Sequence, residues 1–346
     1  MKRVITYILA LSCSVATSFA QFTINGITYE INTINNQEVS VCQYTNEISE
    51  NVEIPSTIEN EENSYSVTQI KERAFEECIN MRTIKLPNTI KSIGEFAFEN
   101  CVNLQSIEIP ESITTIEEYT FSYCISLNQV LLPNTLKTIG DKAFLSCVLL
   151  TEIKLPNSLT DISYSAFNGC QSLKEITIPS EVVNIGKEAF AGCLSLKKVD
   201  FLGRTDLTNQ SIFSQCDSLE TIICRSEKPA ICNINAFDNY DIPIYVPTKS
   251  IEFYQQESGW ENFTNILPLE DITRLNTTFS SNKYIVNIID QEIEIESTKK
   301  SRVEIFNIIG QKKIEDILLQ GKNRFPIKSG IWIIKIEDFC KKVVMQ

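Results

Sequence analysis

Histidine is absent from this 346-residue sequence, and its absence excludes several kinds of site at once. Ser-His-Asp and Cys-His catalysis both require an imidazole, and metal sites built on histidine ligands are excluded with them. The chain has 44 Asp and Glu residues, so catalysis by carboxylates remains open. The composition therefore excludes enzymes that depend on histidine but not those that depend on carboxylates.

Positive charge is also scarce. The sequence has 31 Lys and Arg residues against those 44 acidic residues, which gives a net charge of −13. A chain of this charge is repelled by nucleic acid and by anionic membranes, so we expect no nucleic-acid partner. The sequence contains neither a P-loop nor a dinucleotide-binding fingerprint, and we expect no cofactor. Without histidine or clustered cysteine ligands, we expect no metal either.

Long apolar runs are missing too, and no stretch reaches the roughly 18 residues of a membrane-spanning helix. The N-terminus instead has the pattern of an export signal. Lys2 and Arg3 precede a short apolar run at residues 4–11, and the small residues of Ser18-Phe19-Ala20 predict cleavage before Gln21. We therefore interpret residues 1–20 as a signal peptide. A lipoprotein signal ending at Cys13 is an alternative, although it leaves very little signal before the cut.

What the sequence does contain is a repeat with a period of 23 residues. Its fixed points are a phenylalanine, a cysteine three residues later and a leucine or methionine three residues after that. The phenylalanines are Phe75, Phe98, Phe121, Phe144, Phe167, Phe190 and Phe213. The cysteines are Cys78, Cys101, Cys124, Cys147, Cys170, Cys193 and Cys216. A fixed period between 20 and 50 residues is typical of a solenoid.

Each repeat contains a short strand with the pattern L-x-x-I-x-I-P. Its alternation directs the apolar residues inward and the residues between them outward, and the proline ends the strand. The rest of the repeat returns the chain to the next strand, with glycines such as Gly94, Gly140 and Gly186 at the turn. We expect turns or 3₁₀ structure in this return segment and little regular helix.

The repeated phenylalanines and cysteines predict two buried structural columns, because equivalent positions of a solenoid stack at about 4.8 Å. Paired disulfides are disfavoured, since seven equivalent side chains with parallel Cβ directions cannot all pair. A line of cysteines also differs from the tetrahedral cluster that zinc needs. Cys224 and Cys232 break the 23-residue frame and are the better candidates for a disulfide. The central members of the columns are Phe98, Phe121, Phe144, Phe167, Phe190, Cys101, Cys124, Cys147, Cys170 and Cys193.

The phrase I-G-x-x-A-F-x-x-C-x-x-L-x-x-I-x-I-P resembles the BspA-type leucine-rich repeat of bacterial surface proteins. The flanking segments at residues 22–31 and 242–270 resemble the caps of that family, so the resemblance covers about residues 22–270. The departures are Met81 in place of leucine, Tyr119-Thr120 before the phenylalanine and a seventh repeat without its proline. The resemblance implies a cell-surface protein that acts in adhesion or binding.

Beyond the repeats the hydrophobic period changes to two, with turn glycines at Gly310, Gly321 and Gly330. This alternation predicts a small antiparallel β-sandwich. The stretches "VEIFNIIGQKKI" and "SGIWIIKIEDFCKKVVM" resemble the C-terminal sorting domain of type IX secretion substrates, without its usual Asn-Pro opening. A generic immunoglobulin-like appendage is the alternative.

The predicted organisation is mainly β. It consists of a signal peptide at 1–20, an N-terminal cap at 21–51, a leucine-rich repeat array with its C-terminal cap at 52–270, a linker at 271–282 and a β-sandwich at 283–346. Trp260, Phe263 and Ile266 are expected to cover the last coil.

The outward strand positions form the candidate ligand face, because solenoids commonly bind partners on such a sheet. Leu131 and Ile223 are apolar where solubility favours polar residues, which indicates contact with a partner. The face comprises Lys85, Glu108, Leu131, Lys154, Thr177, Asp200 and Ile223. The row before it comprises Thr83, Ser106, Gln129, Glu152, Glu175, Lys198 and Thr221.

We expect an exported, monomeric, non-enzymatic protein at the cell surface or outside the cell. The resemblance to BspA-type surface proteins implies that it binds, with a host extracellular or matrix protein as its ligand. A glycan-binding module is an alternative, although the face lacks aromatic platforms. A carboxylate-dependent hydrolase is the other alternative. The adjacent acids Glu61-Glu62 and Glu117-Glu118 point apart on a strand and do not form a glycosidase pair. A calcium loop at residues 238–241 lacks the EF-hand spacing and is better interpreted as a turn.

Overall fold

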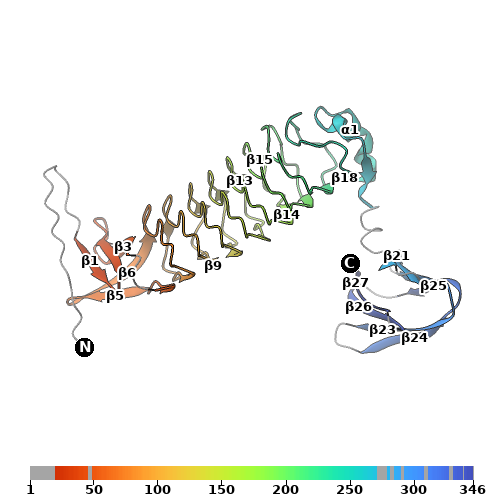
Figure 1. Cartoon of the computed structure of the whole chain (residues 1–346), viewed down its shortest axis with the longest axis horizontal. Coiled ribbons are helices and arrows are strands. Elements are labelled where there is room, and N and C mark those ends of the chain that lie inside the picture. Colours follow the sequence, from red (N-terminus) through yellow and green to blue (C-terminus); the bar gives the residue numbers. More distant parts are fainter. Residues whose placement is uncertain are drawn as a thin grey trace. The chain divides into compact units, whose positions relative to one another are not determined.

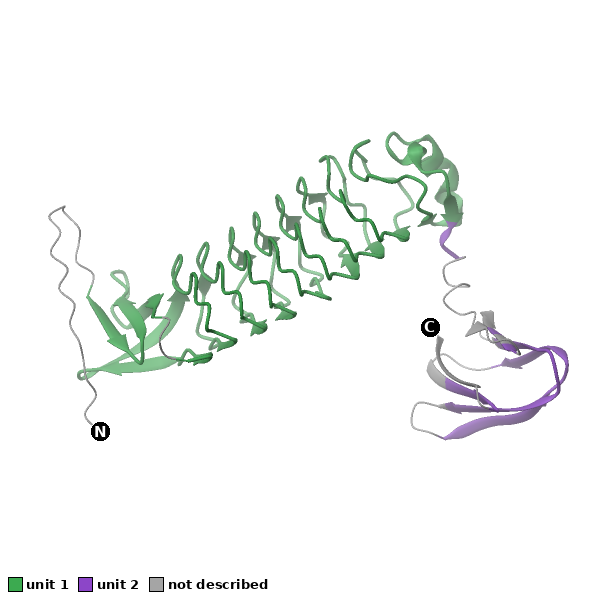
Figure 2. Ribbon diagram, viewed as in Figure 1, with its two compact units in different colours: residues 1–267 green, residues 268–346 purple. Residues whose placement is uncertain are grey.

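The computed structural model describes residues 20–45, 49–270, 279–280, 284–289, 292–307, 311–326, 330–337 and 339–345. The predicted signal sequence, Cys13 included, lies outside these residues apart from Ala20. The chain divides into two compact units, residues 1–267 and 268–346, and each is described by itself (Figure 2). The prediction of a mainly β solenoid of 23-residue coils followed by small antiparallel sheets is confirmed.

An N-terminal sheet precedes the coils. Its strands are β1 (Gln21–Ile24), β2 (Ile27–Ile31), β3 (Glu38–Tyr44), β5 (Thr57–Asn60) and β6 (Asn63–Ile70), in the order β1-β2-β3-β6-β5. The β1–β2 hairpin turns at Asn25-Gly26, where both residues have positive φ (51° and 78°), as a two-residue hairpin turn favours. Phe22, Tyr29 and Tyr65 pack against one another on its inner side.

One short strand per coil forms a parallel ladder along the solenoid, seen as stacked coils in Figure 1. The first part contains β4 (Asn51–Glu53), β7 (Thr83–Lys85), β9 (Ser106–Glu108) and β11 (Gln129–Leu131). The second contains β14 (Glu175–Ile178), β16 (Lys198–Phe201), β17 (Thr221–Cys224), β18 (Ile244–Val246) and β19 (Ile266–Pro268). Equivalent residues pair without a shift, for example Val130 with Ile107 and Val199 with Ile222.

The two parts of this ladder are separated by one coil. Residues 151–156 keep the sequence pattern of the other strands, and Ile153 and Leu155 point inward and are buried. Nevertheless no strand forms there, and the sheets before and after it are separate. The described structure contains no ladder hydrogen bond from the backbone N–H groups of Ile153, Lys154 or Leu155.

The return segments contain more regular structure than the sequence predicts. Two-residue strands recur there as β8 (Ser92–Ile93), β10 (Thr115–Ile116), β12 (Thr138–Ile139), β13 (Asp161–Ile162) and β15 (Asn184–Ile185). β10, β12, β13 and β15 form a second parallel ladder, and β8 pairs with β6. Gly186 follows β15, where an added Cβ would lie 2.4 Å from the Ser163 carbonyl carbon, so only glycine allows the coils to approach this closely.

The phenylalanine column forms the centre of the array. Successive rings from Phe75 to Phe213 lie 5.2–5.4 Å apart between centroids and are nearly parallel. Tyr44 extends the column at its start, 5.5 Å from Phe75, and Phe237 extends it at its end, 5.0 Å from Phe213. Each ring is fully or almost fully buried, which stabilises the fold by roughly 1.5–3 kcal/mol per side chain against exposure.

The cysteine column lies beside it and joins neighbouring coils. The Cys147 Sγ–H donates a hydrogen bond to the Phe121 carbonyl oxygen at 3.2 Å, and that oxygen also accepts the Cys124 backbone N–H at 3.2 Å. The same thiol bond recurs at every coil from Cys101 to Cys216. The column cysteines are buried free thiols in the structure, and so are Cys224 and Cys232, the pair expected to be the better disulfide candidates.

A helical cap ends the array. It contains η1 (Thr248–Ser250), α1 (Ile251–Gln256) and η2 (Trp260–Asn262), followed by β19. Trp260 and Phe263 are buried against Phe237, and Ile266 packs partly buried on the core. The Trp260 indole N–H donates to the Ala230 carbonyl oxygen at 2.7 Å, so the polar edge of this ring is satisfied inside the cap.

The second unit consists of two four-stranded antiparallel sheets. One contains β20 (Phe279–Ser280), β21 (Tyr284–Ile289), β22 (Glu292–Ser297) and β25 (Gly321–Pro326). The other contains β23 (Ser301–Asn307), β24 (Lys312–Leu318), β26 (Gly330–Ile336) and β27 (Phe339–Met345). Because β20 pairs with β21, this sheet begins inside the segment 271–282 that the sequence predicts as a linker. The rest of that segment lies outside the described residues.

Candidate binding surface

The outward strand positions of the first coils form an exposed row. Lys85, Glu108, Leu131, Lys154 and Thr177 are all exposed, and Leu131 keeps 50% of its surface accessible. Leu131 pairs with Glu108 in the β9–β11 register, and Lys154 holds the equivalent position in the next coil. We call this row, together with Gln129, Glu152 and Glu175 beside it, the strand face.

The prediction that this face continues to the end of the array is wrong. Asp200 and Ile223 are buried, with 6% and 2% of their surfaces exposed. Arg225 donates two hydrogen bonds of 2.8 Å to the Asp200 carboxylate, and Tyr245 lies beside Ile223 in the β17–β18 register and is itself buried. The salt bridge and the ring close the surface at this end, so neither Asp200 nor Ile223 is available to a ligand.

Two ion pairs neutralise charges at the margins of the strand face. The Lys85 Nζ lies 2.7 Å from Glu53, and the Lys198 Nζ lies 2.7 Å from Glu175. Glu108, Glu152 and Lys154 form no ion pair with any residue that the structure describes. The unpaired charges therefore lie in the middle of the face, on either side of Leu131.

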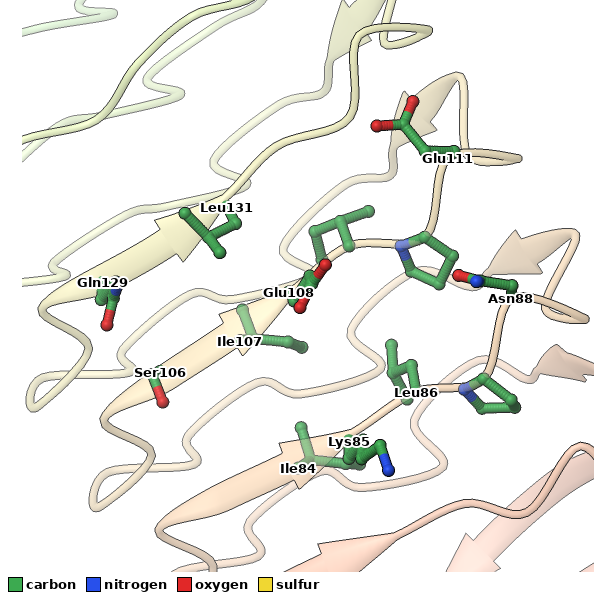
Figure 3. A pocket seen from close by; sticks show the side chains of 13 residues that line it. Ile84, Lys85, Leu86, Asn88, Ser106, Ile107, Glu108, Glu111, Gln129 and Leu131 are labelled. Atoms are coloured by element: carbon green, nitrogen blue, oxygen red, sulfur yellow. The ribbon is translucent and has the colours of Figure 1, made fainter.

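Two hollows cover the strand face and meet at Gln129 and Leu131. The first measures about 500 Å³ and includes Lys85, Glu108 and Glu111. Figure 3 shows its Leu131, Glu108 and Lys85 on three successive strands, with Leu86, Asn88 and Glu111 on the segments that follow. The second hollow, of about 790 Å³, extends over the coil that lacks a strand. Its lining residues are Asn128, Gln129, Val130, Leu131, Thr151, Glu152, Ile153, Lys154, Leu155, Asn157, Glu175, Thr177, Pro179 and Leu202.

The structure also describes two other sites considered from the sequence, the loop at Asp238 and the acidic pair that includes Glu117. Asp238 accepts hydrogen bonds from the Ser214 hydroxyl at 3.0 Å and the Gln215 backbone N–H at 2.7 Å, so it fastens one coil to the next. Burial, with a contribution from Glu95, raises the pKa of Glu117. Within the described ranges, no three acidic or cysteine side chains gather as metal ligands.

A ladder of cations and aromatic rings lies outside the strand face, and the sequence prediction missed it. Its members are Arg73, Phe96, Tyr119 and Lys142, each two residues before a column phenylalanine and each with φ between 54° and 58°. The Phe96 and Tyr119 rings stack at 4.8 Å, with the Arg73 guanidinium 4.0 Å from one ring centre and the Lys142 ammonium 4.6 Å from the other. The 23-residue spacing of these positions was the available signal.

A family model matches most of the solenoid. The model of the BspA type leucine rich repeat region matches residues 46–170 and 137–265, which is more than half of the chain. The protein belongs to the BspA-type leucine-rich repeat family. Proteins of this repeat family are typically non-catalytic binding modules. The C-terminal unit is not covered by the match.

Solved structures similar to this BspA-type protein come from several bacteria. A leucine-rich repeat protein of T. pallidum is 28% identical over 56% of this chain and 88% of its own, with a TM-score of 0.49. One from Bacteroides ovatus is 25% identical over 72% and 76%, with a TM-score of 0.44. A leucine rich cell surface protein of Faecalibacterium prausnitzii is 20% identical over 72% and 95%, with a TM-score of 0.28.

No curated protein matches the sequence. Among the described residues, no helix is long and apolar enough to cross a membrane.

Proposed function

We propose that this BspA-type protein is exported and acts at the bacterial cell surface or outside the cell as a binding and adhesion module for host or matrix proteins. It carries no catalytic centre of its own in this proposal and works as a monomer. The N-terminal signal pattern supports export. The family supports a binding role, since its members are typically non-catalytic binding modules.

The observation that carries the proposal is the pair of hollows that meet at Leu131. Leu131 is an exposed leucine on the edge strand β11, among outward side chains that are otherwise polar, and it offers an apolar anchor. Protein interfaces characteristically combine such an anchor with a polar rim. The face is broad and open, which suits a macromolecular surface better than a small molecule.

The aromatic ladder does not favour the glycan alternative. Sugar-binding platforms need a free ring face, but the faces of Phe96 and Tyr119 are covered by each other and by Arg73 and Lys142. The sheet itself offers no aromatic side chain among its exposed row. Protein is therefore the preferred class of ligand.

We propose in addition that the C-terminal unit is a sorting domain, on the strength of its sequence resemblance. The assignments of residues 1–20 as a signal peptide and of residues 21–51 as an N-terminal cap remain proposals of the same kind.

Binding of the full-length protein to a panel of purified extracellular-matrix proteins tests the proposed function. The informative variant is Leu131→Asp, and Leu194→Asp is its matched control, because Leu194 is 41% exposed but lies outside the two hollows. We expect wild type and Leu194→Asp to bind the same panel member and Leu131→Asp to lose it. Equal binding by both variants would place the interaction elsewhere, and no binding to any panel member would count against the proposal.

A further inference from the structure

The repeat array is far more acidic than the chain as a whole. Residues 21–282 contain 35 Asp and Glu residues against 17 Lys and Arg, a net charge of −18. Residues 283–346 contain 12 Lys and Arg against 9 acidic residues, a net charge of +3. The field around the array therefore attracts cationic partners and repels acidic ones.

The strand face carries part of this excess negative charge on side chains that form no ion pair in the described structure. Glu108 and Glu152 are exposed carboxylates without an ion-pair partner in the described structure, and Glu111 lines the same hollow as Glu108. Lys154 is the one unpaired cation that lines either hollow, since Lys85 is held by Glu53. The unpaired carboxylates Glu108 and Glu111 give the first hollow an excess of negative charge, whereas in the second hollow the unpaired charges of Glu152 and Lys154 balance. Taken together, the two hollows present more unpaired negative than positive charge.

Glu152 is an exposed carboxylate that no described cation neutralises. It occupies the position equivalent to Glu175 one coil earlier, and both line the second hollow. Lys198 forms an ion pair with Glu175, so of these two carboxylates only Glu152 lacks a counter-ion in the described structure. A cationic side chain of a partner would therefore meet an uncompensated carboxylate at Glu152.

We propose that the strand face binds an extended, basic segment of a partner protein, with an apolar side chain on Leu131 and Lys or Arg side chains on Glu108 and Glu152. This inference rests on the proposed binding function and names the chemistry of its ligand. Four to five coils at about 4.8 Å each give the site a height of roughly 20 Å, which about six extended residues cover. A second copy of the array is disfavoured as the occupant because it would bring a second acidic face.

The test uses a fluorescent seven-residue peptide with lysine, leucine and lysine at positions 2, 4 and 6 and serine between them, so that the three side chains share one face of the extended chain. This lysine–leucine peptide is titrated into the full-length protein and followed by anisotropy. Glutamate–leucine and lysine–serine peptides of the same length are the comparison probes. We expect the lysine–leucine peptide to bind at least tenfold more tightly than either, and its affinity to fall with added salt. If charge attraction alone drives binding, the lysine–serine peptide will bind as tightly as the lysine–leucine peptide, and that result would overturn the inference.

Two double variants with the same change of net charge locate the site. Glu108→Gln/Glu152→Gln removes the unpaired carboxylates of the face, whereas Glu59→Gln/Glu252→Gln removes exposed carboxylates on β5 and α1. Exposed ion pairs contribute modestly, so we expect roughly fivefold weaker binding for the first variant and no change for the second. Lys154→Gln should bind more tightly than wild type. Equal losses in the two double variants would overturn the inference.

Failure of the inference and failure of the proposed function give different results. If the glutamate–leucine peptide binds best and Leu131→Ser abolishes its binding, the basic segment is wrong while the strand face remains a binding surface. If the lysine–leucine peptide does not bind at all, the inference is overturned, and the matrix-protein panel decides the proposed function independently.

Discussion

At the scale of single residues, the repeated Phe-x-x-Cys motif is explained by two geometric needs. The phenylalanine supplies a flat ring that stacks on its equivalents, and the cysteine supplies a small side chain with a weak donor. From Phe75 to Phe190, each column phenylalanine carbonyl accepts one hydrogen bond from its own coil, and the thiol of the next coil provides a second one, as Cys147 does for Phe121. A larger or more polar side chain would not suit this buried position.

Phe144→Ala should lower the free energy of unfolding by about 3–5 kcal/mol, because it removes a fully buried ring and leaves a cavity within the column. Lys154→Ala, at an exposed position, should cost less than about 0.5 kcal/mol. Urea denaturation of both variants measures the difference. Similar midpoint shifts would contradict the assignment of Phe144 to the core.

The stability of the array should fall as the pH rises from 9 to 12. Burial raises the pKa of Cys170 from its ordinary value of 9.0 to about 12. Between these values the unfolded chain releases the thiol proton and the folded chain keeps it, so this contribution to stability, fully present below pH 9, is lost as the pH rises. One such group contributes a slope of up to about 1.4 kcal/mol per pH unit.

Cys170→Ala should therefore give a shallower decline of unfolding free energy above pH 9 than wild type, whatever its stability at neutral pH. The slope, measured by urea denaturation at several pH values, is the readout. An unchanged slope would mean that the Cys170 thiol ionises equally in the folded and the unfolded chain.

At the scale of elements, the spacing of apolar residues sufficed to predict the main strands. Few folds other than a solenoid are compatible with a 23-residue repeat that contains a short alternating pattern. The second ladder was harder to see, since two-residue strands such as Thr115–Ile116 carry almost no local pattern. The burial of Asp200 and Ile223 was not predictable from the alternation of apolar and polar residues, which shows only that a side chain points outward. It cannot show that Arg225 binds Asp200 or that Tyr245 lies beside Ile223.

The interrupted coil gives a prediction of its own. Because the backbone N–H groups of Ile153, Lys154 and Leu155 lack ladder partners, they should exchange with deuterium faster than those of Ile107 in β9 and Ile176 in β14. Hydrogen exchange with peptide mapping of the native protein measures this. Protection equal to that of the neighbouring strands would show that the ladder is continuous.

The close approach at Gly186 is tested by a pair of glycine substitutions. Gly186→Ala should be the more destabilising, because its Cβ would lie within 2.6 Å of three backbone atoms of the preceding coil. Gly192→Ala should cost roughly 1–2 kcal/mol from its φ of +69° alone, since its Cβ would have ordinary contacts of 3.6 Å. Thermal melting of both variants compares them, and the reverse order would contradict the assigned packing.

At the scale of the whole molecule, the array and the C-terminal unit each have a separate hydrophobic core. Glu294 in the second unit is buried between Lys322 and Arg324, and the hydrogen bond from Lys322 is the main cause that lowers its pKa. The array is covered at its end by its own residues, Trp260 and Phe263. The two units should therefore fold independently of each other.

Deletion of residues 271–346 should leave the melting temperature of the array nearly unchanged and should trap the protein inside the cell envelope if the tail is a sorting domain. The thermal midpoint and the surface-exposed fraction in a producing cell are the two measurements. A large drop in the midpoint would make the tail part of the cap. Normal surface display without it would contradict the sorting role.

We expect this protein to bind its partner on the strand face around Leu131. Hydrogen exchange of the full-length protein, free and bound to a matrix protein that retains it, tests this claim most directly. We expect slower exchange on binding in residues 83–88, 106–111, 129–134 and 151–157, with little change at Asp200 and Ile223. Protection confined to the Arg73–Lys142 ladder or to the C-terminal unit would contradict it.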